Sequence, residues 1–190
     1  MKKTLILFII ISFFSCLTKK EKKTEYLQHE IPFLNRRINL PKNYISISFT
    51  DYKNIIRESY TDTVFVNLKV REIEKMEIKF PDYSMFCDKN NFENTLLITF
   101  MLNLRINKFI KNEFADFIIK DLKNKGKKAD FIYRNMENKL IDDWLIKVKG
   151  KKTYKNSENQ IYITHYMASN FGAFVSINEK EFDFEKELSE

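Results

Sequence analysis

The sequence predicts an α+β fold: an antiparallel sheet with one main amphipathic helix, at about residues 105–125, packed on it. Short runs that alternate apolar and polar residues occur on both sides of that helix, as strands do. A third observation concerns the amino terminus, where an apolar run ends at Cys16 and a Lys-rich polar segment follows. We therefore expect a signal peptide at 1–15, a lipidated cysteine and flexible tether at 16–40, and a single domain at 41–190.

The first fifteen residues have the pattern of a secretory signal. Lys2 and Lys3 precede an apolar run over 5–14, and Ser15 supplies the small residue expected before a cleavage site. A membrane-spanning helix needs about 20 apolar residues, so this run is too short to cross a bilayer. The pattern predicts export.

The stretch MKKTLILFIIISFFSC resembles the signal peptide of bacterial lipoproteins, whose last residues are roughly Leu, small, small, Cys. Phe13 and Phe14 stand where Leu and a small residue are usual. The resemblance implies cleavage between Ser15 and Cys16 and a diacylglycerol on Cys16, with the lipid bilayer as the partner of that anchor. It places the protein on the outer or cytoplasmic membrane with its domain outside the cytoplasm. An ordinary cleaved signal and a chance hydrophobic start are the alternatives.

The segment before the helix predicts several short elements. Residues 17–30 are polar and without periodicity, as in a tether. Alternation predicts strands at 45–49, 63–70 and 76–80, a short helix is expected at 51–60, and 81–94 is expected to be a loop. The run TLLITFML at 95–102 is apolar on both faces and predicts a central strand.

The main helix follows from residues that share half of a helical wheel, with Gly126 just past its end: Ile106, Phe109, Ile110, Phe114, Phe117 and Ile118. Glu113 and Asp121 are expected near the edges of that face. Turn-like ENK, KNSEN and SNF then separate strands at 129–136, 143–150, 160–168 and 172–177, before a short acidic helix or frayed tail. This order is similar to the PsbP/Mog1-type fold found in some bacterial lipoproteins, which implies a fold and no function.

Composition excludes several kinds of site. The three glycines, Gly126, Gly150 and Gly172, are dispersed at predicted turns, so no phosphate-binding loop can form. The two histidines and Cys87 lack the paired spacing of a zinc site. With Cys16 lipidated, Cys87 has no disulfide partner; a packed thiol is the interpretation we favour over a Cys87–His165 dyad. The sequence predicts no metal, cofactor or catalytic residue.

Two further features of the sequence could indicate a functional site. Asp142 and Asp143 lie beside the single tryptophan, Trp144, and are interpreted as a turn that precedes a core anchor rather than an acid–base pair. The formal net charge of +7 becomes +5 (7 − 2) without Lys2 and Lys3. On an exported protein this basic balance does not indicate nucleic-acid binding, and none is expected.

Three functions remain. The first is a non-enzymatic envelope lipoprotein that binds another envelope component, such as a protein. The second is a carrier of a small apolar ligand, with Tyr162 and Tyr166 beside residues 95–102 as the pocket. The third is a carboxylate-based hydrolase, for which the candidate residues are Asp142, Asp143, Glu113 and Asp121.

Overall fold

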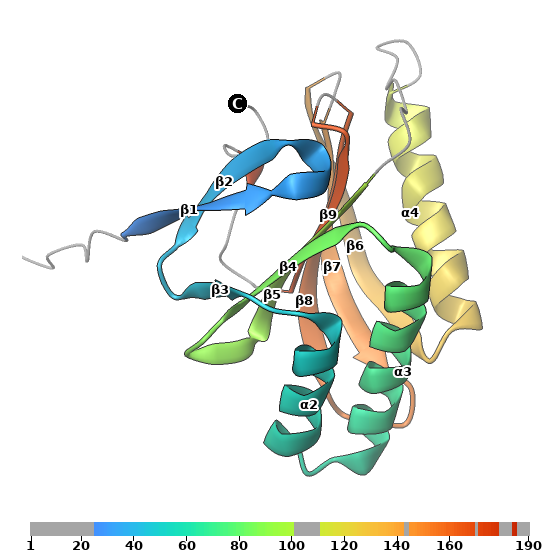
Figure 1. The fold of residues 1–190 in the computed structure, drawn as a ribbon. Coiled ribbons are helices and arrows are strands. Elements are labelled where there is room, and N and C mark those ends of the chain that lie inside the picture. Colours follow the sequence, from blue (N-terminus) through green and yellow to red (C-terminus); the bar gives the residue numbers. More distant parts are fainter. Residues whose placement is uncertain (1–24, 101–110, 143–144, 170, 179–183, 186–190) are drawn as a thin grey trace, which may run out of the picture.

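The protein is α+β, with a seven-stranded antiparallel sheet of order β3-β4-β5-β9-β8-β7-β6 and a separate two-stranded hairpin (Figure 1). This computed structural model describes residues 25–100, 111–142, 145–169, 171–178 and 184–185. The strands are β1 Tyr26–Ile31, β2 Arg36–Pro41, β3 Tyr44–Ser46, β4 Tyr83–Asp88, β5 Asn91–Phe100, β6 Phe131–Asp142, β7 Leu145–Tyr154, β8 Gln160–Ala168 and β9 Ala173–Asn178. The helices are η1 Pro32–Leu34, α2 Phe49–Ser59, α3 Thr63–Lys79 and α4 Lys111–Lys128.

The sheet is covered on both faces. Strand residues alternate in direction, so one set of side chains meets the β1–β2 hairpin and the other set meets the helices. Ile31 and Leu40 of the hairpin pack with Leu96, Val175 and their neighbours in one cluster. On the other face, α2 and α3 pack over β4 and β5, and α4 packs over β7 and β8, in two separate clusters. No described helix is long and apolar enough to cross a membrane.

Helix α3 replaces the two strands predicted at 63–70 and 76–80, which are wrong. Asp62 caps the helix: its carboxylate accepts a hydrogen bond of 3.0 Å from the backbone N–H of Phe65. Phe65, Val70 and Ile73 are buried, whereas Ile78 is 85% exposed. The apolar residues at 64–70 are compatible both with the alternation of a strand and with one face of a helix. Packing against the sheet favours the helix.

The loop predicted at 81–94 is also wrong, because β4 and the start of β5 occupy it. Three consecutive residues of β4 are buried: Met85, Phe86 and Cys87. A strand covered on both faces shows no apolar–polar alternation, so its periodicity gave no signal. The strand predicted at 95–102 is confirmed as part of β5, and the short helix predicted at 51–60 is confirmed as α2.

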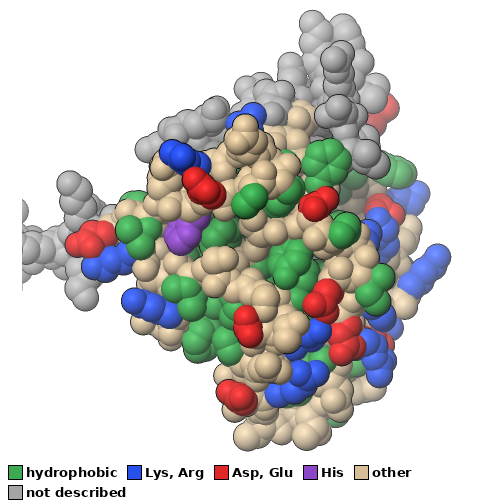
Figure 2. All heavy atoms as spheres, in the orientation of Figure 1, with side chains coloured by type: hydrophobic (Ala, Val, Ile, Leu, Met, Phe, Trp, Pro, Cys, Tyr) green, Lys and Arg blue, Asp and Glu red, His purple; other side chains and the backbone are tan. Residues whose placement is uncertain are grey.

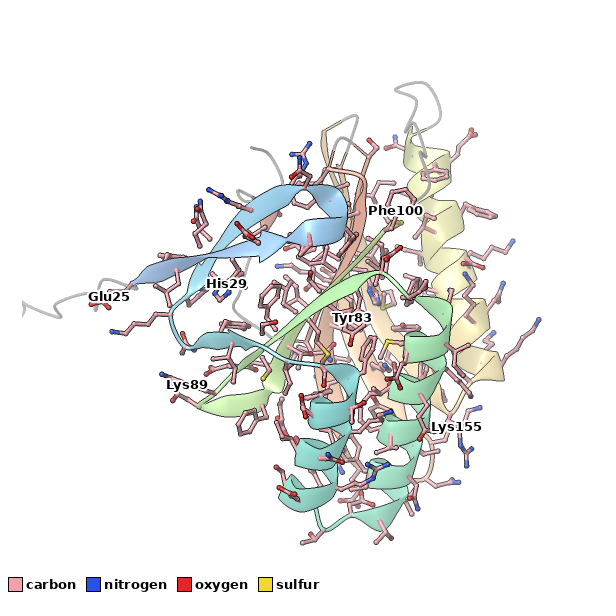
Figure 3. All side chains as sticks on the ribbon, in the orientation of Figure 1. Glu25, His29, Tyr83, Lys89, Phe100 and Lys155 are labelled. Atoms are coloured by element: carbon pink, nitrogen blue, oxygen red, sulfur yellow. The ribbon has the colours of Figure 1, made fainter. Side chains whose placement is uncertain are left out.

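The predicted tether at 16–40 is wrong from Tyr26 onwards, because β1 and β2 pair along their whole length. Ile38 and Leu40 are buried against the sheet. The His29 ring of β1 meets the Phe86 ring of β4 edge-on with centroids 5.0 Å apart, so the hairpin lies directly over the sheet (Figure 3). The lysines between residues 19 and 23 directly precede β1 and gave this region the composition of a tether. The anchor residues Ser15 and Cys16 lie outside the described residues.

Three α-helices are described where one main helix and one short helix were predicted, and the main helix is confirmed over 111–125 and continues to Lys128 as α4. Residues 101–110, with three of its expected apolar positions, lie outside the described residues. Phe117 is 61% exposed rather than buried. Gly126 lies within α4 and not after it; a Cβ there would come within 3.0 Å of the Tyr133 ring, so glycine permits close contact between helix and strand.

The four strands predicted after the helix are confirmed as β6 to β9. The turn expected at residues 137–139 is wrong, since β6 continues through it to Asp142. Gly150 also lies inside a strand, opposite a bulge of β6, where a Cβ would overlap the Met136 sulfur and approach the Arg134 carbonyl oxygen to 3.0 Å. Close contact with the bulge therefore requires glycine at this position.

Leu40 and Leu27 test whether the hairpin is part of the fold. They are register partners, but Leu40 is fully buried and Leu27 is 52% exposed. Leu40→Ala should lower the free energy of unfolding by about 2–5 kcal/mol, because it leaves a cavity between hairpin and sheet. Leu27→Ala, the matched control, should change it by less than about 1 kcal/mol. Equal small effects in urea unfolding would mean that residues 26–41 do not contribute to the folded core.

Candidate functional site

A cavity of about 560 Å³ lies between α3, α4 and the helical face of the sheet. It occupies the gap between the two apolar clusters on that face, one under α2 and α3 and the other under α4. Its floor crosses six strands, from β4 to β6. Much of its wall is apolar, contributed by Met76, Met85, Leu97, Ile118, Leu122, Ile163, Met167 and Phe174.

Polar side chains cluster at the β6–β7 side of the cavity, around the carboxylate of Glu72 on α3. Glu72 accepts hydrogen bonds from the ammonium of Lys152 and from the hydroxyl of Tyr154, the latter at 2.5 Å. Lys152 and Tyr154 lie two residues apart on β7, so both side chains point to the helical face of the sheet. The three residues bind α3 to β7.

The charge state of this cluster follows from its burial and its neighbours. Burial acts to raise the pKa of Glu72, but the ammonium groups of Lys152 and Lys69 hold that pKa below its ordinary value. Burial, together with the Glu72 carboxylate, raises the pKa of Tyr154 well above its ordinary value. Glu72 is therefore an anion at neutral pH, and Tyr154 is a neutral hydrogen-bond donor to it.

Lys69 stands one helical turn before Glu72 and is 4% exposed. Its ammonium lies 5.8 Å from the centre of the Tyr154 ring, but no hydrogen bond or salt bridge joins it to another described residue. Burial lowers the pKa of Lys69 to about 8, against the attraction of Glu72. Glu72 thus forms its salt bridge with Lys152, while Glu72 and Glu93 attract Lys69 without a salt bridge to it.

His165 of β8 faces the same cavity and is 4% exposed. Its Nε2 lies 3.3 Å from the Tyr133 hydroxyl, and its ring stacks on Phe174 with centroids 5.2 Å apart. Its buried Nδ1 has no hydrogen-bond partner among the described residues. Burial, with a contribution from Lys152, lowers the pKa of His165 to about 3, so the imidazole is neutral at physiological pH.

Salt bridges at the cavity rim are more exposed. Asp130, before β6, pairs with Arg71 at 3.3 Å and Lys75 at 3.7 Å, and so joins α3 to the end of the α4–β6 connection. Asp121 pairs with Lys125 one turn further along α4, at 2.5 Å. On the face drawn in Figure 2, Lys and Arg side chains are interspersed with Asp and Glu, and neither sign covers it alone.

Tyr162 and Tyr166 were expected to line a pocket, but they lie on the face of β8 opposite the cavity. His165 and Met167 alternate with them and face the helices. Tyr162 is exposed, and the buried Tyr166 hydroxyl accepts a hydrogen bond of 3.1 Å from the backbone N–H of Phe184. The sequence thus indicated a pocket on this strand and assigned it to the wrong face.

The Cys87–His165 dyad cannot form. Strands β5 and β9 separate β4 from β8, and three interstrand steps place the two residues about 14 Å apart or more. Cys87 is a free, buried thiol, as expected, and burial together with Asp88 raises its pKa to about 11. A thiol with that pKa is a poor nucleophile at neutral pH.

The candidate carboxylates do not come together in the described part of the chain. Glu113 is exposed near the start of α4, and of the four residues only Asp121 is found in the cavity lining. The Asp142 side chain, Asp143 and Trp144 lie outside what the structure describes. The described residues contain no group of three or more His, Cys, Asp or Glu side chains placed to hold a metal ion.

Comparison with known proteins adds little to this site. No family model matches the chain, and neither does any curated protein. Among solved structures, the solution structure of cyanobacterial PsbP (CyanoP) from Synechocystis sp. PCC 6803 is similar at 9% sequence identity, with 89% of this chain and 88% of that chain covered and a TM-score of 0.46. No inference about function follows from a likeness of this degree.

The charge on Lys69 should be visible in the pH dependence of stability. Above about pH 8 the folded state has released the Lys69 proton, while the unfolded chain keeps it up to its ordinary pKa of 10.5. The contribution of Lys69 to the free energy of unfolding therefore rises with pH in that range. The advantage of Lys69→Met over wild type in urea unfolding should shrink by about 1–3 kcal/mol between about pH 7 and pH 10.

The exposed Lys89, changed to Met in the same way, provides the control. Its difference from wild type should stay constant over the same pH range, because its side chain is exposed to water in the folded and the unfolded state. An advantage of Lys69→Met that stays constant or grows with pH would show that Lys69 is not a desolvated cation.

Proposed function

We propose that this protein is an envelope lipoprotein, anchored through Cys16, whose domain binds a small and mostly apolar molecule between α3, α4 and the sheet. The observation that carries the proposal is the cavity of about 560 Å³, which lies within the roughly 300–1,000 Å³ of ligand pockets. Its composition also fits, since pockets of this kind join an apolar wall to a few convergent polar groups. The ligand-carrier hypothesis is thereby favoured over the others.

A cavity of this size is not a packing defect of ordinary magnitude. Protein interiors are close-packed, with few voids larger than a water molecule. The cavity is also lined by buried polar groups without a hydrogen-bond partner among the described residues, the Lys69 ammonium and the Nδ1 atom of His165. Burying such groups without partners lowers stability. That cost is accounted for if the groups serve a bound molecule.

The proposed anchor would hold the domain close to the bilayer. Strand β1 begins at Tyr26, ten residues after Cys16 (26 − 16). Even a fully extended chain of that length spans at most about 35 Å. A ligand of low water solubility would then pass over a short distance between the membrane and the cavity.

The second candidate is the envelope-partner hypothesis. It is favoured by exposed apolar side chains on the two helices that frame the cavity, Ile78 on α3 and Phe117 on α4. A protein partner would bind these outer helix surfaces. The hydrolase hypothesis has no comparable observation among the described residues, because Glu113 is exposed and Asp121 lines the cavity without it.

Filling the cavity should abolish ligand binding. Ser176 lies on the central strand β9, next to His165 in the register, and lines the cavity floor. The full chain in a non-ionic amphipol should bind the apolar dye N-phenylnaphthylamine, and Ser176→Phe should weaken that binding at least about tenfold, or about 1.4 kcal/mol. Ser46→Phe, at an exposed position of β3, is the matched control. Unchanged dye binding in Ser176→Phe would contradict the proposed site.

The anchor is tested independently of the cavity. Cells grown with labelled palmitate should incorporate it into the wild-type chain and not into Cys16→Ser, because the thiol is the proposed site of lipid attachment. The wild-type chain should also fractionate with membranes. Incorporation that persists in Cys16→Ser, or that is absent from the wild type, would exclude the lipoprotein assignment.

A further inference from the structure

We infer that the molecule held in this cavity is an amphipathic monocarboxylate, such as a fatty acid, bound with its carboxylate at Lys69, its hydrocarbon chain along the apolar wall and His165 as a second polar contact. The inference rests on the proposed function, and it adds the charge and orientation of the ligand. Two observations carry it independently: a buried ammonium without a partner, and a buried imidazole nitrogen without a partner.

Lys69 is a buried cation that has no hydrogen bond or salt bridge to another described residue. The carboxylate of Glu72 is already engaged, because it accepts from Lys152 on one oxygen and from the Tyr154 hydroxyl on the other. No described carboxylate contacts Lys69, which is 4% exposed and lines the cavity. A buried ammonium is costly without a partner, and a charge-assisted hydrogen bond to an anion removes much of that cost.

The charge of the cluster sets the charge of the ligand. Glu72 forms its salt bridge with Lys152, and Lys69 has none with a described residue, so a single negative charge on the ligand supplies the partner that Lys69 lacks. A second negative charge on the ligand would meet the Glu72 carboxylate within the same buried region and be repelled. A neutral headgroup would leave the Lys69 ammonium without an anionic partner. The arrangement therefore selects a monoanion over a dianion such as a phosphate monoester.

His165 adds direction to this site. Burial raises the pKa of Tyr133, so its hydroxyl keeps its proton and can donate it to Nε2 of His165. In that arrangement Nδ1 carries the hydrogen of the neutral imidazole and becomes a donor. A buried nitrogen without a partner on the cavity wall is open to a polar atom of a bound molecule. His165 therefore offers a second polar contact to a bound molecule, on β8 rather than on α3.

The rest of the cavity suits a hydrocarbon chain. Met76 of α3, Met85 of β4 and Met167 of β8 lie around it, and methionine side chains adapt to flexible apolar ligands. The charged residues of the rim, among them Asp130 and Asp121, are paired with neighbouring basic side chains. The headgroup is directed to Lys69, because a buried ammonium gains more from an anion than an exposed ammonium does.

The test compares ligands that share a chain and differ in the headgroup. The full chain in non-ionic amphipol, loaded with N-phenylnaphthylamine, is titrated with laurate, dodecanol and dodecyl phosphate. Laurate should displace the dye at concentrations at least about tenfold lower than dodecanol or dodecyl phosphate. Lys69→Met should abolish the preference for laurate over dodecanol while dodecanol still binds. The exposed Lys89→Met should retain the wild-type preference.

The outcomes separate this inference from the proposed function. If laurate and dodecanol displace the dye equally from the wild type, or dodecyl phosphate displaces it best, the monocarboxylate assignment is wrong while the cavity still binds ligands. If Lys69→Met keeps the preference for laurate, the headgroup does not bind at Lys69. If the wild type binds neither dye nor any of the three compounds, the proposed function itself fails.

Discussion

The carboxylate of Glu72 joins helix α3 to strand β7 beside the gap in the helical layer. The sheet is apolar on both faces, and the helices that cover one of them pack as two separate clusters over opposite halves. Beside the gap between those clusters, Glu72 of α3 makes polar contacts with Lys152 and Tyr154 of β7. A buried ion pair is weak evidence for stability by itself, and the apolar clusters supply most of the folding energy. In this protein, the ion pair of Glu72 and Lys152 gives the mostly apolar cavity one polar wall.

Much of the sheet could be predicted from sequence, and the exceptions have specific causes. Strands β6 to β9 alternate or end at turn residues, so they were found; strand β4 is buried on both faces and left no periodic signal. Helix α3 was mistaken for strands because Val64, Val66, Leu68 and Val70 alternate. The β1–β2 hairpin was missed because the lysines directly before it gave the region the composition of a tether, although Ile31, Ile38 and Leu40 are buried.

The site was less predictable than the fold. His165 stands out in the sequence because the chain has only two histidines. Lys69 and Lys152 do not stand out among 33 Lys and Arg residues, nor does Glu72 among 26 Asp and Glu residues. Their burial results from long-range packing of α3 on the sheet, which no local pattern reports. The three-residue spacing of Lys69 and Glu72 would have indicated a shared face had the segment been interpreted as a helix. The choice of Tyr162 and Tyr166 failed because strand β8 is apolar on both faces.

The claim that the cavity holds an amphipathic acid is tested most directly by native mass spectrometry of the chain extracted from its own membranes. The account predicts a chain that begins at Cys16, carries lipid and retains one non-covalently bound organic acid. It also predicts that Lys69→Met prepared in the same way loses the bound acid and keeps the lipid. A wild-type chain without any bound molecule, or the same adduct on Lys69→Met, would contradict it.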